Sequence, residues 1–230
     1  MNNNLKPALA ELIGTFTLTF IGAGAGAVGG RIGGALGVAL AHGVALMVII
    51  YAWGAVSGAH VNPAVTLGPA VTGKIDWMKA AYYWVAQFVG AALAAYLLLY
   101  LVGAADLVNG ATLGDFTKAD PLKTIVIEAV LTFFLVTAVF ATAVNGRNGN
   151  AAGLAIGFVL VMDILMGGPL TGASMNPART FGPALATLDF SYLWMYILGP
   201  ALGAVGAALL YDRLFLTAPE SPAPARKGKK

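Results

Sequence analysis

Ser57–Ala70 reads SGAHVNPAVTLGPA, and Thr171–Ala184 reads TGASMNPARTFGPA. Nine of the fourteen aligned positions are identical, including every glycine and every proline. Short motifs that recur by accident do not match to this extent. The chain therefore contains an internal duplication, and each copy centres on an Asn-Pro-Ala triplet.

Each copy has the pattern of a helix start. Asn62 and Asn176 can cap a helix, and a proline follows each at the first helical position, where its missing amide hydrogen costs no hydrogen bond. The helical pattern then covers about 63–71 and 177–188. Roughly ten residues at ~1.5 Å each cross only about half of the ~30 Å hydrocarbon core of a bilayer. Both copies are therefore predicted to be half-length helices.

The composition indicates an integral membrane protein. Of the 230 residues, 59% are apolar and only 10% are charged, and the mean hydropathy is +0.81. A soluble domain has a charged fraction nearer ~25%. There are no cysteines, so disulfide and thiol chemistry are excluded. The net charge of +3 gathers in a basic tail at 219–230, which favours a flexible, solvated end over a nucleic-acid site.

Six apolar runs are long enough to cross a bilayer, and the fifth is the shortest. They lie at about 8–28, 36–56, 80–102, 124–144, 151–166 and 192–216. The run from Ala8 is interpreted as a retained span because no signal-peptide pattern precedes it. The half-length helices follow the second and fifth spans. The predicted fold is thus an all-α membrane protein with six spans and two re-entrant half-helices.

The basic residues set the expected orientation. With both termini inside, nine of the thirteen lysines and arginines are cytoplasmic: Lys6, Lys74, Lys79, Arg147, Arg213, Arg226, Lys227, Lys229 and Lys230. Because each half holds three spans, the second half enters from the opposite face, and the repeats are inverted. The chain is predicted to be one channel domain, with a first repeat at 8–102, an outer connection at 103–123 and a second repeat at 124–216. Short termini and loops favour a prokaryotic cytoplasmic membrane.

Two acidic residues extend the duplication. Glu11 and Glu128 are each followed at plus four by Thr and at plus five by Phe. A carboxylate inside a span costs ~2.5–3.5 kcal/mol on insertion scales, so two at matched positions need a shared reason. One interpretation places both at span ends near water. The other has each accept hydrogen bonds from the unwound backbone before its half-helix, which is a structural rather than a catalytic role.

Small residues indicate close contacts between helices. Gly33 and Gly37, and Gly199 and Gly203, are spaced four apart, and Gly90 is followed by Ala94. Such pairs let membrane helices approach closely.

Half-helices that come from opposite faces meet near the midplane with their N-termini facing. Each N-terminus carries about half a positive charge, which repels cations. Neutral molecules that accept hydrogen bonds from Asn62 and Asn176 can pass, while a proton-carrying chain of waters is interrupted. Arg179 lies three residues after Asn176, whereas Val65 holds the matching position in the first copy. The outer half of the pore is therefore predicted to carry a one-sided fixed charge.

These features resemble the aquaporin, or major intrinsic protein, family over about 8–214. The resemblance is carried by the six spans, the matched Glu11 and Glu128, and the two motifs with Asn62, Pro63, Ala64, Asn176, Pro177 and Ala178. It implies six tilted helices with two half-helices, a pore in each protomer, and a homotetramer. It also implies a passive channel for water and small neutral solutes, without enzyme activity, cofactor or nucleic-acid partner.

The resemblance further implies an outer selectivity filter at His42, Ile164, Ala173 and Arg179. This set is similar to the vacuolar-membrane (tonoplast) intrinsic proteins of plants. An apolar Ile164 and a small Ala173 imply a wider opening with one apolar wall, which suits ammonia, hydrogen peroxide or urea beside water. A glycerol or urea facilitator is the alternative, although glycerol facilitators typically have Asp where this chain has Thr180. Tyr196 and Ile197 also depart from the water-channel pattern of the sixth span.

Three residues need separate interpretation. His60 is expected to support the first loop or the cytoplasmic end of the pore, since no metal-ligand spacing of His, Cys or carboxylates occurs. Asp163 has no assigned role, and we expect it to face a neighbouring protomer or water at the outer end of the pore. An ion-coupled secondary transporter is the rival class, because inverted repeats with broken helices are also typical of transporters. Ser57 and Ser174 stand in no nucleophile pattern, which argues against an enzyme.

Overall fold

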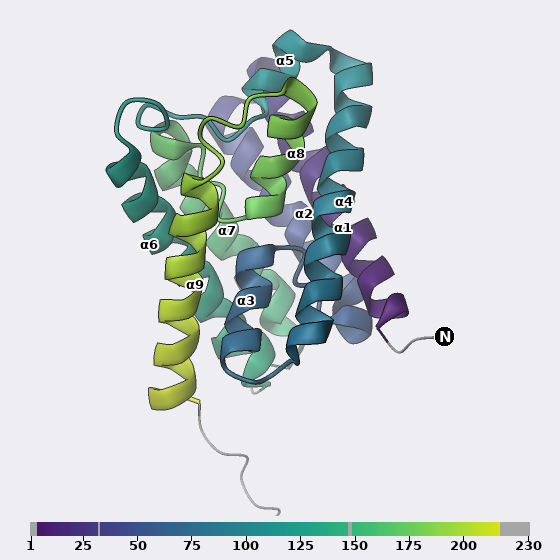
Figure 1. Ribbon diagram of the computed structural model, residues 1–230, viewed down its shortest axis with the longest axis vertical. Helices are drawn as coiled ribbons and strands as arrows, with labels where there is room; N and C mark the ends of the chain where they lie inside the picture. Colours follow the sequence, from purple (N-terminus) through teal and green to yellow (C-terminus); the bar gives the residue numbers. More distant parts are fainter. Residues whose placement is uncertain (1–3, 32, 147–148, 217–230) are drawn as a thin grey trace, which may run out of the picture.

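The computed structural model describes residues 4–31, 33–146 and 149–216, and within these ranges no residue lies in a strand. Six of the described helices are long and apolar enough to cross a membrane, as predicted (Figure 1). They are α1 (Leu5–Ala27), α2 (Gly34–Ser57), α4 (Trp77–Val102), α6 (Pro121–Val139, continued by a π-helical turn at Phe140–Val144), α7 (Ala152–Thr171) and α9 (Met195–Leu214). The predicted tail at 219–230 and Arg147 lie outside the described residues.

The two half-helices are α3 (Pro63–Val71) and α8 (Pro177–Thr187). Both stand inside the bundle, α3 in its lower part and α8 in its upper part (Figure 1). Their bounds match the expected ones to within one residue. Neither is long enough to cross a membrane alone.

The fifth and sixth spans differ from the prediction in their ends. Helix α7 does not end at 166 but continues to Thr171, through Pro169, and stops at Gly172 in the left-handed conformation, φ 83°. A proline in the last turn loses one hydrogen bond, and packing inside the bundle compensates for that loss. Helix α9 begins at Met195 and not at 192, because the chain turns at the preceding residues.

The two halves pack as an inverted pair. Helix α1 packs on α4 and α6 packs on α9, while α2 and α7 meet across the two halves. Each half-helix rests on the last long helix of the other half, α3 on α9 and α8 on α4. This exchange ties the halves into one bundle and brings both half-helix N-termini to its centre.

Glycines permit the closest helix contacts. A methyl group on Gly90 would clash with the backbone of α1 at Leu12 and Phe16, and one on Gly203 would clash with α6 at Ala129 and Phe133. Leu12 follows Glu11 directly, as Ala129 follows Glu128, so the two contacts are equivalent in the repeats. The expected contact at Gly33 is absent, because this residue caps α2 at φ 91° and a methyl there would meet no atom within 4 Å.

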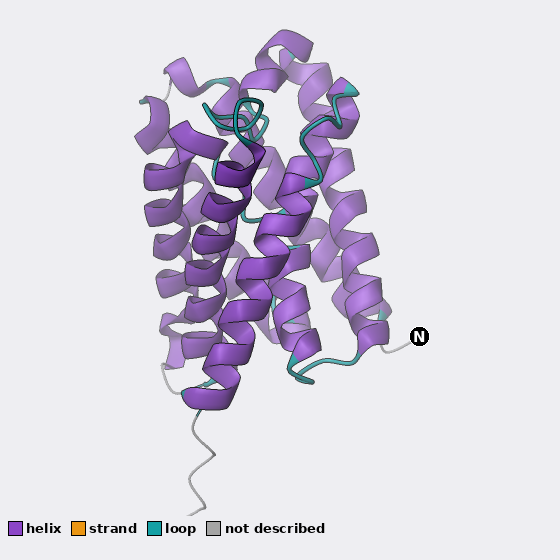
Figure 2. Ribbon diagram, turned by 60° about the vertical axis from the view of Figure 1, so that its left-hand side comes forward, coloured by secondary structure: helices purple, strands orange, loops and turns teal. Residues whose placement is uncertain are grey.

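The connection between the repeats is more ordered than a plain loop. It contains the short helix α5 (Ala104–Asn109), and its later part is hydrogen-bonded to the end of α7, with Asp115 N donating to Pro169 O at 3.0 Å and Phe116 N to Leu170 O at 2.9 Å. Two single turns, η1 (Gly29–Arg31) and η3 (Gly149–Ala151), precede α2 and α7. Helix α5 lies at the end of the bundle opposite to the two ends of the described chain (Figures 1 and 2).

Candidate functional site

The asparagines of the two motifs cap the half-helices. Asn62 Oδ1 accepts from Ala64 N at 2.8 Å and from Val65 N at 3.4 Å. Asn176 Oδ1 accepts from Ala178 N at 3.1 Å and, within the same turn, from Arg179 N at 3.2 Å. The prolines occupy the first helical position in both. In both half-helices, the unpaired backbone N–H groups of the first turn are therefore capped by an asparagine at the matching position of the repeat.

The same asparagines also join the two halves. Asn62 Nδ2 donates to Met175 O at 2.8 Å, and Asn176 Nδ2 donates to Val61 O at 2.9 Å. These bonds link residues more than a hundred positions apart in the sequence. An Asn amide has two N–H donors. One donor of each asparagine is thus used between the halves, and the second has no partner among the described residues, beside a cavity that both asparagines line.

The loops before the half-helices are strained. Ala59, Val61, Ala173 and Met175 all have positive φ, between 43° and 52°, although none is glycine. Such a conformation costs about 1 kcal/mol or more for each residue. It persists only where surrounding contacts hold it.

Glu11 provides those contacts in the first half. Its Oε1 accepts from Ser57 Oγ at 2.6 Å and His60 N at 2.9 Å, and its Oε2 accepts from Val61 N at 2.6 Å and Gln87 Nε2 at 2.8 Å. The side chain is fully buried. A carboxylate with four donors is well solvated by the protein, so its charge is compatible with burial.

Glu128 has the same position in the second half. Its Oε1 accepts from Thr171 Oγ1 at 2.7 Å and Ser174 N at 3.0 Å, and its Oε2 accepts from Met175 N at 2.7 Å. It too is fully buried. Both acids thus bond the unwound backbone before a half-helix, and neither lies at a span end near water.

Two buried tyrosines, which sequence reasoning did not identify, donate hydrogen bonds to the backbone where these loops begin. Tyr83 Oη donates to Ser57 O at 2.6 Å, and Tyr196 Oη donates to Thr171 O. Ser57 and Thr171 are the last residues of α2 and α7. The signal was present as a repeat, since each tyrosine follows its partner by 26 or 25 residues. Tyr196, the aromatic residue noted before Gly199, therefore has a structural role, whereas Ile197 after it is 46% exposed.

His42 and Arg179 meet beside the first turn of α8. Arg179 donates to His42 Nε2, from Nε at 3.4 Å and from Nη2 at 3.3 Å. His42 Nδ1 lies 2.9 Å from Val38 O. A carbonyl only accepts and a guanidinium only donates, so Nδ1 carries the hydrogen and Nε2 is the acceptor. The network therefore selects a neutral histidine, and Gly22 leaves the space that its ring occupies.

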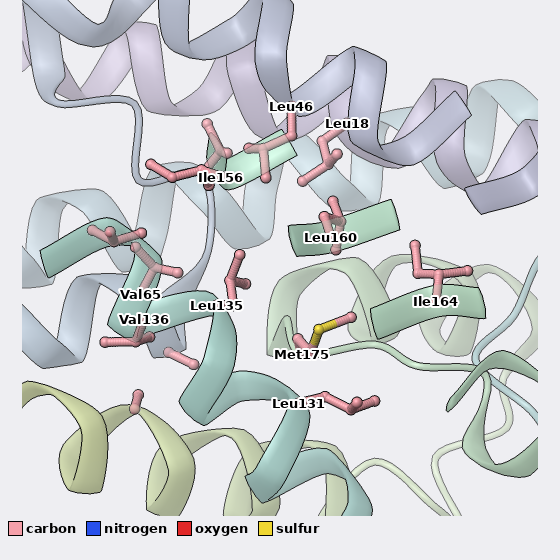
Figure 3. Close-up of a cluster of buried hydrophobic side chains, with 14 of the residues drawn as sticks. Leu18, Leu46, Val65, Leu131, Leu135, Val136, Ile156, Leu160, Ile164 and Met175 are labelled. Atoms are coloured by element: carbon pink, nitrogen blue, oxygen red, sulfur yellow. The ribbon is translucent and has the colours of Figure 1, made fainter. Parts of the chain in front are cut away.

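This pair separates two cavities. The inner cavity extends from His60 past Asn62 and Asn176 to His42 and Arg179. Its apolar wall contains Leu18, Leu46, Val65, Leu135, Val139, Ile156 and Leu160. The same residues belong to the main hydrophobic cluster of the molecule (Figure 3). Part of what would be a core in a soluble bundle is thus the wall of a passage.

The outer cavity begins on the other side of the pair. Three of the four expected filter residues line it: His42, Ile164 and Arg179. Ala173 follows Gly172, which also lines this cavity, and its methyl group lies close to Gly167 of α7. Nη1 of the buried Arg179 has no hydrogen-bond partner among the described residues, so it remains available to a molecule between the cavities.

The connection between the repeats supplies wall residues that the sequence analysis did not assign. Asn109, Ala111 and Leu113 line the outer cavity. Thr112 Oγ1 is hydrogen-bonded to Thr180 Oγ1 at 2.9 Å, which fastens this segment to α8. The only sequence signal was the pair of glycines, Gly110 and Gly114, which pack closely against α1 and α7.

His60 lines the inner cavity and is held by its surroundings. Its Nδ1 lies 3.2 Å from Thr66 Oγ1, and its ring packs edge to face on Tyr83 at 5.3 Å between centroids. Across the described part of the chain, no three His, Cys, Asp or Glu side chains form a group suited to a metal ion.

Asp163 does not lie where it was expected. Its side chain is 1% exposed in the single chain, so it faces neither water at the outer end nor a neighbouring protomer. Both of its carboxyl oxygens lack a hydrogen-bond partner among the described residues. Its side chain is therefore enclosed inside the bundle.

Known proteins resemble this chain in sequence and in fold. The sequence profile of the family described as Major intrinsic protein matches residues 1–211. Aquaporin NIP1-4 of Oryza sativa subsp. japonica is 43% identical over 216 residues, which cover 93% of this chain and 78% of the relative. Aquaporin TIP1-2 of Zea mays is 42% identical over 225 residues, covering 92% and 86%. The X-ray structure of the aquaglyceroporin from Plasmodium falciparum superposes with a TM-score of 0.80 at 23% identity, covering 92% of this chain and 96% of that one.

Proposed function

The chain belongs to the major intrinsic protein family, whose members are channels rather than enzymes, and we propose that it conducts water, ammonia and other small neutral solutes passively while excluding protons and ions. The observation that carries the proposal is the pair of half-helix N-termini joined by crossed asparagine bonds beside the passage. Two N-termini that face each other present positive potential to any cation. The free amide donors of Asn62 and Asn176 bind the oxygen or nitrogen of a neutral solute.

The proposed filter supports ammonia beside water. His42 is neutral in its hydrogen-bond network, and Nη1 of Arg179 has no partner among the described residues. These two polar groups line the outer cavity together with the apolar Ile164. An apolar wall lowers the penalty for a solute that makes few hydrogen bonds, and Ala173 leaves more width than a larger side chain. We propose His42, Ile164, Ala173 and Arg179 as the residues that select the solute.

A glycerol facilitator is the second candidate, because the same apolar wall and small Ala173 also suit a larger polyol. Thr180 argues against it. This side chain is buried and its hydroxyl is bonded to Thr112 and to Ser174, at 2.9 and 2.5 Å, so it is tied into the loop support rather than turned toward a solute. A secondary transporter is distinguished by flux that saturates or follows an ion gradient.

The proposed setting is a cytoplasmic membrane, with both termini on the cytoplasmic side. It rests on the excess of basic residues at that end, including Lys6, Lys74 and Arg213. Lys74 also forms an ion pair of 2.9 Å with Asp212 there. Four protomers, each with its own pore, are the proposed assembly.

Stopped-flow light scattering on proteoliposomes tests the function, with wild type compared with the double substitution His42→Phe, Ile164→His. We expect fast water flux with a low activation energy in both proteins, and ammonia flux in the wild type only. Water flux equal to that of empty liposomes would contradict the channel. Ammonia flux retained in the double variant would contradict the assigned filter.

A further inference from the structure

Asp163 is a buried carboxyl group without a partner in the part of the chain that the structure describes. An ionised carboxylate in such a site costs several kcal/mol unless other groups compensate its charge. Because the chain is duplicated, the surroundings of Glu128 and Asp163 can be compared with the matching residues of the first half. The comparison shows which hydrogen bond the second half lacks.

The first half satisfies its buried acid with one more donor than the second. Gln87 Nε2 donates to Glu11 Oε2 beside the Val61 amide, so this oxygen has two donors. Glu128 Oε2 accepts only from Met175 N among the described residues. One acceptor site on Glu128 is therefore left open.

The missing donor follows from the sequence of α9. Gly90 and Gly203 make equivalent contacts with α1 and α6. Gln87 lies three residues before Gly90, and Pro200 lies three residues before Gly203. Proline has no side-chain donor and no amide hydrogen. The second half therefore cannot copy the bond that Gln87 makes.

The register of α7 brings Asp163 toward the part of α6 that carries Glu128. Gly43 and Gly157 pack against each other where α2 and α7 cross, so position 163 matches Ile49, six residues further on in each helix. Ile49 packs on α1 at Gly14, three residues after Glu11. Gly167, one turn after Asp163 on α7, packs against Leu131 of α6. Leu131 lies three residues after Glu128.

Figure 3 labels Leu131 of α6, Met175, and Ile164, which directly follows Asp163 on α7. Asp163 and Glu128 are also close enough to act on each other electrostatically. Arg179 is the cation that acts on Glu128. One nearby positive charge can balance only one of two buried acids.

We propose that Asp163 is a neutral carboxylic acid that, through one buried water molecule, completes the hydrogen bonding of Glu128 and replaces the amide that Gln87 supplies in the first half. The Asp163 O–H donates to the water, and the water donates to Glu128 Oε2. Thr132, one turn after Glu128 on the same face of α6, has a buried hydroxyl without a partner among the described residues and provides a third contact. A water with two to four polar partners is a normal part of a protein interior. Asp163 is thus a positioning residue for the loop that ends at Asn176.

Infrared spectroscopy of the full-length protein in liposomes tests the protonation. We expect the C=O stretch of a protonated carboxylic acid at pH 7.5, displaced in D2O and lost in Asp163→Asn. Asp189→Asn, at the exposed end of α8, is the control and keeps the band. Absence of the band from the wild type means that Asp163 is ionised and overturns the proposal. A band at the position of a carboxyl group without hydrogen bonds overturns the water bridge.

A permeability comparison tests the positioning. Asp163→Ile copies Ile49 and removes the bridge, so we expect the ratio of glycerol to water permeability to rise by about fivefold, equivalent to about 1 kcal/mol. Asp163→Asn can still bond a water on both sides and is expected to restore the wild-type ratio. The double variant Asp163→Ile, Pro200→Gln rebuilds the arrangement of the first half and is expected to do the same. A ratio in Asp163→Ile equal to that of the wild type contradicts the positioning role. The infrared result does not depend on transport, so it stands or falls separately from the channel function.

Discussion

Each motif asparagine makes three different contacts with one small side chain. Its oxygen caps a half-helix, one amide hydrogen binds the opposite loop, and the other faces the passage. Asp has the same shape but no donor, and Gln is one methylene longer. The residue type is therefore restricted by geometry as well as by chemistry.

Asn62→Asp tests this use of the side chain. The carboxylate still caps α3, but it cannot donate to Met175 O, and it places a negative charge where the helix ends repel cations. We expect proton or cation leakage to increase and stability to fall by about 1–3 kcal/mol from the unpaired carbonyl. A pH-sensitive dye inside proteoliposomes measures the leakage. Leakage no greater than in wild type would show that the asparagine donor and the local charge do not control exclusion.

Tyr83 and Tyr196 act on the backbone at the ends of α2 and α7. Tyr196→Phe leaves the buried Thr171 carbonyl without this donor, which we expect to cost about 1–3 kcal/mol of unfolding free energy. Thermal unfolding in detergent measures the change, and Tyr100→Phe is a suitable control because Tyr100 is 84% exposed. Equal midpoints in the two variants would mean that the Tyr196 hydroxyl contributes nothing to the loop.

At the scale of helices, the spacing of α2 and α7 depends on two glycines. A methyl group on Gly43 would lie 2.6 Å from Gly157 O, which is backbone and cannot turn away. The crossing joins the two halves on the side of the bundle where His42 and Ile164 are held. A small separation at this point would therefore alter the proposed filter as well as the packing.

Gly43→Ala is expected to lower the unfolding midpoint and the yield of folded protein, since the helices must separate to accept the methyl group. Gly206→Ala is the matched control, because the nearest atom would lie at an ordinary 3.8 Å. Alanine favours a helix interior over glycine by about 1 kcal/mol, so this control should be neutral or stabilising. If Gly43→Ala behaves like Gly206→Ala, the crossing is not tightly packed.

At the scale of the whole molecule, the outer surface carries many large apolar side chains. Large apolar side chains are about half exposed along the outward faces of all six long helices, including Leu9, Val48, Val85, Phe134, Phe158 and Leu202. Such a surface suits lipid or a neighbouring copy of the chain. Among the described residues, four side chains of charged residue types are buried inside the bundle instead: Glu11, Glu128, Asp163 and Arg179.

The proposed tetramer belongs to this scale. Native mass spectrometry from mild detergent should give a complex of four 23.5 kDa chains, because paired apolar faces are more stable together than in a thin detergent layer. Crosslinking in liposomes checks the assembly in a bilayer. A single chain in both measurements, with water flux intact, would leave the pore assignment in place and remove the tetramer.

The sequence by itself determined the family, the six spans, the half-helices and the residues of the two motifs. These follow from local signals: apolar length, Asn-Pro helix starts, and a duplication that makes each signal appear twice. Glu11 and Glu128 were found in the same way, because an acid inside a span is costly and two at matched places need a common role. The ends of α7 and α9 were less predictable, since tertiary packing overrides the usual effect of proline.

Only the tertiary structure decided how these residues meet. The crossed bonds of Asn62 and Asn176, the tyrosine hydroxyls and the pairing of His42 with Arg179 join positions from 25 to 137 residues apart. No local pattern encodes such distances, because they depend on which helix faces are packed together. Asp163 shows this best: a span residue expected at water or at a protomer contact is enclosed inside the bundle, because neighbouring helices cover that face of α7.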